Sequence, residues 1–395
     1  MEATPPPVSG SVSQPAEPKS DSSNTPKPPL KYLVPSFNFT QTQEYLQALK
    51  HHLNNEVICY FISDTNSIRQ NHPDLFLDRL KSLGHMPRLS MVLVSNGGSG
   101  LASLRIASIL RQYCDFLQII VPSRCASAAT MLALAADEIV MSPAGYLTAI
   151  DSSITHELNP KGPDGLPVSV SVDQVKRIIH YLQDEGLSHD ENGNIEGAYR
   201  TLFKYLHPMA LGEIDRASSV SLMIAKRIMK MHVHTFGSEE KIDQLANHLI
   251  NNYPAHGFPI LLDEASAMGL PAVQASPQIS DVLWDLVKAY DVCTNPATTH
   301  INEGHYKFHA FPVAIEAEGY RTAYEVNYFR RLNLINRKWQ TEGDRTRWVN
   351  ITKGTKPDSV SIKSIDARES PSTPEITPPG SLDQPPKTLP PIMPS

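Results

Sequence analysis

Apolar runs alternate with amphipathic patterns along the central part of the chain. Runs typical of buried strands are predicted at 55–63, at 89–100 up to a glycine turn, at 116–122 and at 138–143. Helices are predicted between them at 73–84, at 101–114 and in the stretch that starts at 123. Strands and helices that alternate at this spacing require crossover connections, which place the strands parallel. The pattern therefore predicts an α/β fold.

The pattern changes in the second half of the chain. From 173 to about 291 it is mostly helical, and 307–335 then predicts two strands around an Ala-Glu-Gly turn. Both ends are rich in Pro, Ser and Thr and lack the apolar residues needed for a core. We therefore expect four parts: a disordered terminus at 1–30, an α/β domain with a helical extension at 31–292, a small β-containing region at 293–352 and a disordered tail at 353–395.

Composition excludes several classes of protein. A net charge of −6 gives no basic field for nucleic acid or an anionic membrane. The four cysteines are scattered without metal-ligand spacing, which indicates a reduced protein rather than a disulfide framework. No apolar run reaches the length of a membrane span, and the N-terminus lacks the pattern of a signal peptide. We expect a cytoplasmic protein that needs no metal and no other cofactor.

The first candidate for chemistry is the turn that follows the strand at 89–94. Asn96-Gly97-Gly98 leads directly into a helix, and glycines allow close approach and positive φ. Backbone N–H groups at such a turn can bind a developing negative charge. A simple tight turn is the alternative. A phosphate site is disfavoured because neither GxGxxG nor GxxxxGK[ST] is present.

The second candidate is the next junction between a strand and a helix, which contains three serine or cysteine side chains. Ser123 is a plausible helix cap, and Cys125 is expected to be a small buried residue. Ser127 differs because the alanines around it leave space beside its hydroxyl. A nucleophile at Ser127 would have the N–H of Gly98 on one side and that of Ala128 on the other.

The segments "SNGGSGLASLRIASIL" and "SRCASAATMLALAADEIVMSPAGYLTAIDSSI" resemble the Clp-fold serine peptidases. They are most similar to the serine dehydrogenase proteinase (SDH) family, which is related to signal peptide peptidase A. "LHPMALGEIDRA" and "HGFPILLDEASAMGLP" resemble the helical C-terminal region of that family. The resemblance spans roughly 55–273, and 95–154 is its specific part. It implies a Clp/crotonase-like core, a nucleophile at Ser127 and an oxyanion hole from Gly98 and Ala128, with Gly97 beside them.

The sequence also departs from the family pattern. Asn96 replaces the Pro that commonly precedes the two glycines, Ala128 and Ala129 replace a Gly pair, and Ser152 replaces the Pro after Asp151. These changes remove neither a hydroxyl nor a backbone donor. They leave the substrate and the efficiency of the site open.

The resemblance is less specific about the general base. Clp proteolytic subunits use a His soon after the nucleophile helix, where this chain has Asp151, to which we give a supporting role. SDH-type members resemble Ser-Lys enzymes, and matching their helix to "VSVDQVKRII" selects Lys176. A lysine becomes a base when burial lowers its pKa. His180, His156 and the absence of a protein base remain alternatives.

Other histidines are given structural roles. His207 and His256 fit the family pattern but are expected to support the fold, and His232 with His234 lacks the third ligand of a metal site.

The sequence therefore predicts a serine endopeptidase with protein or peptide substrates, which forms a homo-oligomer as its relatives do. A catalytically inactive Clp-fold scaffold that recruits partners through its tails is the first alternative. A crotonase-type acyl-CoA enzyme is the second.

Overall fold

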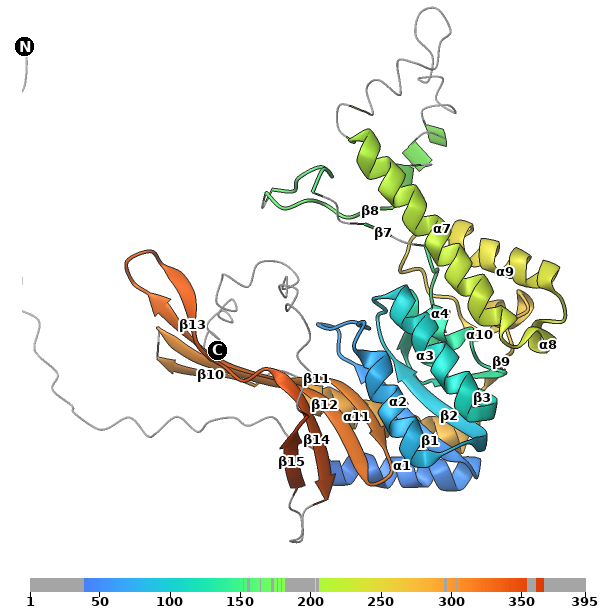
Figure 1. Ribbon diagram of the computed structural model, residues 1–395, viewed down its shortest axis with the longest axis horizontal. Helices are drawn as coiled ribbons and strands as arrows, with labels where there is room; N and C mark the ends of the chain where they lie inside the picture. The colour runs from blue at the N-terminus through green and yellow to red at the C-terminus, as the bar shows by residue number, and fades with distance from the viewer. Residues whose placement is uncertain are drawn as a thin grey trace, which may run out of the picture. The chain divides into compact units, whose positions relative to one another are not determined.

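The computed structural model describes most of the chain between the two Pro-rich ends (Figure 1). The described residues are 39–151, 153–154, 157–163, 165–171, 174–175, 177–178, 180–181, 203, 206–294, 297–302, 304–353 and 360–365. The segments expected to be disordered lie almost entirely outside this set.

Five parallel neighbours form one half of the main sheet, from β1 in its middle to β9 at its edge. Their order is β1-β2-β3-β5-β9, with bounds Glu56–Ile62, Met86–Val94, Cys114–Val121, Glu138–Met141 and Ala272–Gln274. The first four correspond to the predicted strands. β9 was not expected, because it has three residues and no apolar run. The predicted α/β fold class is confirmed.

Side chains of β1 alternate between two cores, as a strand buried on both faces requires. Ile58 and Tyr60 pack in one core, whereas Val57 and Phe61 pack in the other. The first core receives α2 (His72–Leu83), α3 (Gly100–Tyr113) and α4 (Ala128–Ala133). The second receives α1 (Phe39–Leu53) and α11 (Pro277–Thr294). Helices therefore cover both faces of the sheet.

The C-terminal strands continue this sheet on the other side of β1. β11 (His305–Ala317) pairs antiparallel with β1, and β12 (Tyr320–Asn333) pairs with β11 around the predicted Glu318-Gly319 turn. The remaining strands are β10 (Ala297–Asn302), β13 (Lys338–Asp344), β14 (Arg347–Lys353) and β15 (Val360–Ser364). The predicted β region is thus joined edge to edge with the parallel core.

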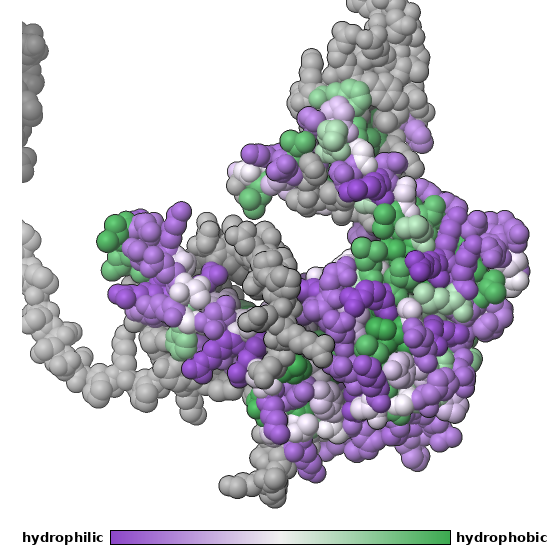
Figure 2. All heavy atoms as spheres, viewed as in Figure 1, coloured by the Kyte–Doolittle hydropathy of each residue, from purple (hydrophilic) through white to green (hydrophobic). Residues whose placement is uncertain are grey.

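The helical extension begins with α7 (Pro208–Lys230), which packs against α3 and α4. It continues with α8 (Val233–Phe236), α9 (Glu239–Asn251) and α10 (Leu262–Ala267). Figure 2 shows hydrophobic residues gathered on the surface over α7 and the neighbouring helices. No helix among the described residues is both long and apolar enough to cross a bilayer.

Candidate active site

The segment that precedes Ser127 is held against the carboxyl end of β2. Ser95 donates its N–H to the Arg124 carbonyl at 3.0 Å, and Ala126 donates its N–H to the Ser95 carbonyl at 3.0 Å. β4 (Arg124–Cys125) pairs on its other side with β6 (Tyr146–Leu147). These contacts bring the glycine turn after β2 next to Ser127.

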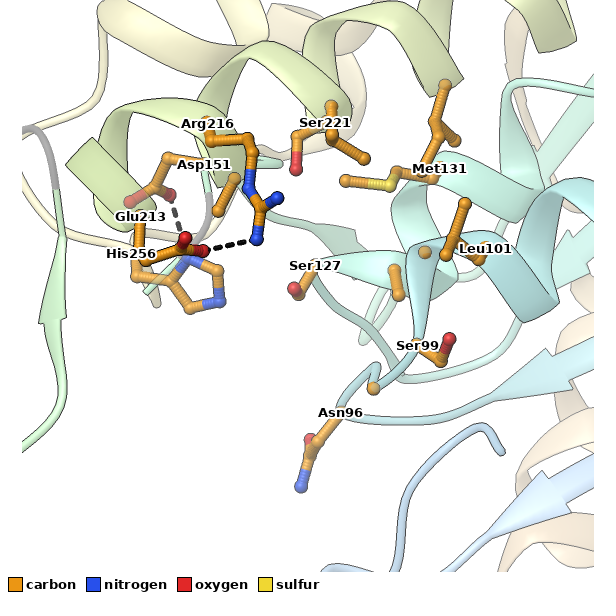
Figure 3. A pocket seen from close by; sticks show the side chains of 16 residues that line it. Asn96, Ser99, Leu101, Ser127, Met131, Asp151, Glu213, Arg216, Ser221 and His256 are labelled. Carbon is orange, nitrogen blue, oxygen red and sulfur yellow. Dashed lines mark hydrogen bonds and ion pairs between the residues drawn. The ribbon is translucent and has the colours of Figure 1, made fainter. Parts of the chain in front are cut away.

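Ser127 occupies the N-cap position of α4 in a conformation that is uncommon for serine. Its φ is 54° and its ψ is −118°, whereas residues with a Cβ rarely adopt positive φ. An N-cap serine normally accepts a hydrogen bond from the first turn, but the Ser127 side chain makes no such bond. Its hydroxyl bonds to no described residue and faces a cavity (Figure 3).

Ser123, predicted as the plausible cap, is not the cap of this helix. It precedes β4, and its hydroxyl is buried without a hydrogen-bond partner among the described residues. A cap at Ser123 requires a helix that starts at the next residue, but β4 follows Ser123 and α4 starts only at Ala128. The prediction of a cap at Ser123 was therefore wrong.

Two threonines hold the backbone around Ser127. The Ser127 N–H donates to Thr148 Oγ1 at 2.8 Å, and the Thr148 N–H donates to Thr130 Oγ1 at 3.1 Å. Thr130 Oγ1 in turn donates to the Cys125 carbonyl at 2.8 Å. This chain of bonds ties the strained residue to the strand before it and to the loop after β6.

The two glycines of the turn have no room for a side chain. Their φ values are 101° at Gly97 and 137° at Gly98. A Cβ on Gly97 would lie 2.8 Å from the Ser127 Cβ and 3.0 Å from the Ala128 nitrogen. A Cβ on Gly98 would lie 2.6 Å from the backbone N and O of Ile68. The glycine pair therefore permits the close approach of the turn to the start of α4.

Gly98 and Ala128 each keep an unused backbone donor. Gly97 and Ser99 on either side of Gly98 bond to Ile68, but the Gly98 N–H donates to no described residue. The Ala128 N–H, in the first turn of α4, likewise has no described acceptor, as expected for the first N–H groups of a helix. Both residues line the cavity that Ser127 faces.

The cavity has a volume of about 640 Å³ and two chemically different walls. Leu101, Met131, Val220 and Ile224 of α3, α4 and α7 make an apolar wall. Asp151, His256 and the ion-paired Glu213 and Arg216 of α7 make a polar wall. Figure 3 shows Ser127 between the two groups.

The polar wall contains a hydrogen-bonded carboxylate and imidazole. His256 Nδ1 lies 2.7 Å from Asp151 Oδ1, and the Asp151 side chain is 12% exposed whereas that of His256 is 42% exposed. The hydrogen bond to Asp151 raises the pKa of His256 above its ordinary value of 6.5, against the opposing effect of burial. In Figure 3 the His256 ring lies on the side of Asp151 that faces the cavity and Ser127.

None of the bases predicted from the sequence is a described residue that lines the cavity beside Ser127. Lys176 and His156 lie outside those residues. His180 is exposed and does not line the cavity. Cys125 is fully buried, and burial raises the pKa of its thiol well above the ordinary range, which agrees with an inert packing role.

The other histidines have structural contacts. His207 caps α7 by accepting the Met209 N–H at 3.2 Å. His232 is buried, with Nε2 2.9 Å from the Leu134 carbonyl and Nδ1 3.1 Å from Thr235 Oγ1. No cluster of three metal-ligating side chains exists among the residues that the structure describes.

His256 is the residue that the sequence did not assign to the site. It lies 105 positions from Asp151 and 129 from Ser127 (256 − 127), in the turn after α9. The motif "HGFP" was visible, but nothing local to it distinguishes a histidine in a cavity from one that supports the fold.

Comparisons with known proteins identify no family for this chain. No model of a known protein family matches it, and no curated protein matches it. The resemblance to the SDH family therefore stays a prediction.

The solved structures to which this chain is similar include ClpP1 from Listeria monocytogenes, a point mutant of it and a stomatin-specific protease. ClpP1 from Listeria monocytogenes has 12% identity and a TM-score of 0.29, covering 59% of this chain and 99% of that one. A point mutant of that ClpP1 has 14% identity and a TM-score of 0.30, covering 58% and 99%. A point mutant of the 1510-N membrane-bound stomatin-specific protease has 14% identity and a TM-score of 0.31, covering 58% and 82%. Identities and TM-scores this low support no argument about chemistry, so the function of the site has to be inferred from the residues of this chain.

Proposed function

We propose that the protein is a serine hydrolase that cleaves peptide bonds, with Ser127 as the nucleophile. One observation supports this most strongly. Ser127 is an N-cap serine with a positive φ, and its hydroxyl makes no capping hydrogen bond and faces a cavity. A serine with a purely structural role is expected to have an unstrained backbone and a hydrogen-bonded hydroxyl. Strain of this kind costs about 1–3 kcal/mol and persists where the surrounding structure enforces it.

The two unused donors supply the second part of the mechanism. When the Ser127 oxygen attacks a carbonyl carbon, the carbonyl oxygen gains negative charge. The N–H groups of Gly98 and Ala128 flank the serine and have no other described acceptor, so they are suited to stabilise that charge. One such donor contributes roughly 10²–10³-fold in rate.

The sequence resemblance proposes Lys176 as the base, and this residue lies outside those that the structure describes. The peptide substrate, the SDH relationship and the homo-oligomer are likewise proposals that rest on the sequence resemblance, and the cytoplasmic location is a proposal that rests on composition.

A fluorophosphonate probe tests the proposed nucleophile without knowledge of the substrate. We expect one adduct at Ser127, located by peptide mass spectrometry, and complete loss of labelling in Ser127→Ala. Ser123→Ala is the matched control, because it removes a nearby hydroxyl that has no described partner, and it should be labelled like the wild type. A folded protein that shows no labelling would favour the scaffold, and binding of a CoA thioester without labelling would favour the acyl-CoA enzyme.

A further inference from the structure

We infer that His256, oriented by Asp151, is the general base that activates Ser127. The inference rests on the proposed function, since it assumes that Ser127 is the nucleophile. It differs from the prediction made from the sequence, which placed a lysine in this role and gave His256 a structural one.

Backbone pairing brings the two loops of this pair together. Leu147, at the end of β6, exchanges hydrogen bonds with Ile260, at 3.0 Å and 2.8 Å. Ile150, next to Asp151, donates its N–H to the Leu249 carbonyl of α9 at 3.1 Å. The loop that leads to Asp151 is therefore bonded to the chain on both sides of His256, at Leu249 and at Ile260. The same loop contains Thr148, which holds the Ser127 backbone.

The bond to Asp151 defines which nitrogen of His256 is available. An ionised carboxylate can only accept, so Nδ1 carries the proton that is donated to Asp151 Oδ1. The neutral ring then has its lone pair on Nε2. Nε2 bonds to no described residue, and the ring faces the cavity that Ser127 also faces (Figure 3). A neutral imidazole in this tautomer is suited to accept a hydroxyl proton.

Two charged side chains besides Asp151 and His256 line the cavity. Glu213 and Arg216 of α7 form an ion pair with each other, so their charges largely cancel at the ring. Asp151 is the more buried partner and remains as the group that supports positive charge on His256.

The proton transfers balance over one reaction cycle. Ser127 Oγ forms a bond to the carbonyl carbon while its proton moves to His256 Nε2 and the carbonyl π electrons move to oxygen. The C–N bond then breaks, and Nε2 returns the proton to the leaving amine. A water molecule next gives a proton to Nε2 and attacks the acyl carbon, and Ser127 Oγ leaves with that proton. Asp151 acts throughout as a positioning residue.

The test is the rate constant for fluorophosphonate labelling of Ser127, measured from pH 5 to pH 9. In the wild type we expect the rate to rise with pH around a midpoint above 6.5, because only neutral His256 is a base and Asp151 raises its pKa. His256→Gln should lower the plateau roughly 10²–10⁴-fold and abolish the midpoint, with an unchanged circular dichroism spectrum. Imidazole in the buffer should partly restore the rate of His256→Ala.

Asp151→Asn separates positioning from a merely structural role. It should lower the plateau because the tautomer is no longer fixed, and shift the remaining midpoint below that of the wild type because the carboxylate that raises the pKa is gone. His234→Gln, at an exposed histidine outside the cavity, is the control and should match the wild type.

Two results would overturn the inference in distinguishable ways. If His256→Gln is labelled at Ser127 with the wild-type rate and midpoint, His256 is not the base, and loss of labelling in Lys176→Met would then identify the lysine. If the folded wild type is not labelled at Ser127 at any pH, the proposed function itself fails and the inference fails with it.

Discussion

The backbone of Ser127 is strained, and neighbouring residues hold it in that conformation. Its positive φ costs about 1–3 kcal/mol, and the bonds that offset this cost come from Thr148 and from the backbone around Cys125. Gly97 is required on the other side, because any side chain there would meet Ser127 and Ala128 at less than van der Waals distance. The position of the hydroxyl is therefore determined by a small set of neighbours that can be changed one at a time.

Replacing Thr148 by Val tests this restraint. The substitution leaves the half-buried Ser127 N–H without its acceptor, which costs about 1 kcal/mol. We expect a lower melting temperature and a decrease of roughly tenfold in the labelling rate at Ser127. Thr148→Ser retains the hydroxyl and should behave like the wild type. A Val variant that is labelled at the wild-type rate would show that this bond does not position the nucleophile.

At the scale of elements, α2 is attached to β1 through a buried histidine. His72, the first residue of α2, is 1% exposed, and its Nδ1 accepts the Tyr60 hydroxyl of β1 at 2.6 Å. The Arg69 N–H donates to the same nitrogen at 3.3 Å. Burial lowers the pKa of His72 from 6.5 to about 3, and the positive charge of nearby Arg69 lowers it as well.

This pKa predicts that the protein loses stability in acid at pH values well above those at which carboxylates titrate. The unfolded chain binds a proton at His72 near pH 6.5, whereas the folded chain does not until about pH 3. Stability from this residue is therefore complete above pH 6.5 and is lost as the pH falls toward 3, at up to about 1.4 kcal/mol per pH unit.

Urea unfolding at pH 7 and pH 5 measures the effect. His72→Gln should be less stable at pH 7 but should lose less stability between the two pH values than the wild type. His51→Gln, at an exposed position of α1, is the control and should keep the wild-type slope. Equal slopes in His72→Gln and the wild type would contradict the predicted titration.

The predicted strands and helices were found where the apolar pattern is continuous. β1, β2, β3 and β5 are buried on both faces, so each is a run of apolar residues that the sequence displays directly. β9 was missed because Val273 and Gln274 are exposed and its pairing with β5 leaves no pattern along the chain. α1 was not predicted either, because polar residues such as Thr42 and Gln43 are buried in it as partners of a distant carboxylate.

At the scale of the whole molecule, that carboxylate joins the parallel core to the C-terminal strands. Glu316 of β11 is fully buried and accepts hydrogen bonds from Thr42 and Gln43 of α1, Tyr290 of α11 and Arg321 of β12. The negative charge of Glu316 raises the pKa of Arg321 against strong desolvation. Helices from both halves of the chain thus meet at one ion pair.

Glu316→Gln should therefore destabilise the whole molecule rather than the C-terminal strands alone. Removing one charge of a buried pair leaves the other uncompensated, at a cost of about 3–5 kcal/mol. We expect urea midpoints from circular dichroism and from tryptophan fluorescence to fall together. Glu318→Gln, at a half-exposed pair with Lys50, is the matched control and should cost less than about 1 kcal/mol. Separate transitions for the two signals would show that the C-terminal strands unfold independently.

The sequence by itself determined the parallel core, the glycine turn and the serine that follows the next strand. These features are local, because a buried strand, a positive φ and a helix N-terminus each depend on a few consecutive residues. Only the tertiary structure decided what faces Ser127. Asp151 and His256 meet through loop pairing over 105 positions, and a contact between loops leaves no periodic pattern from which this pairing or the role of His256 could be predicted.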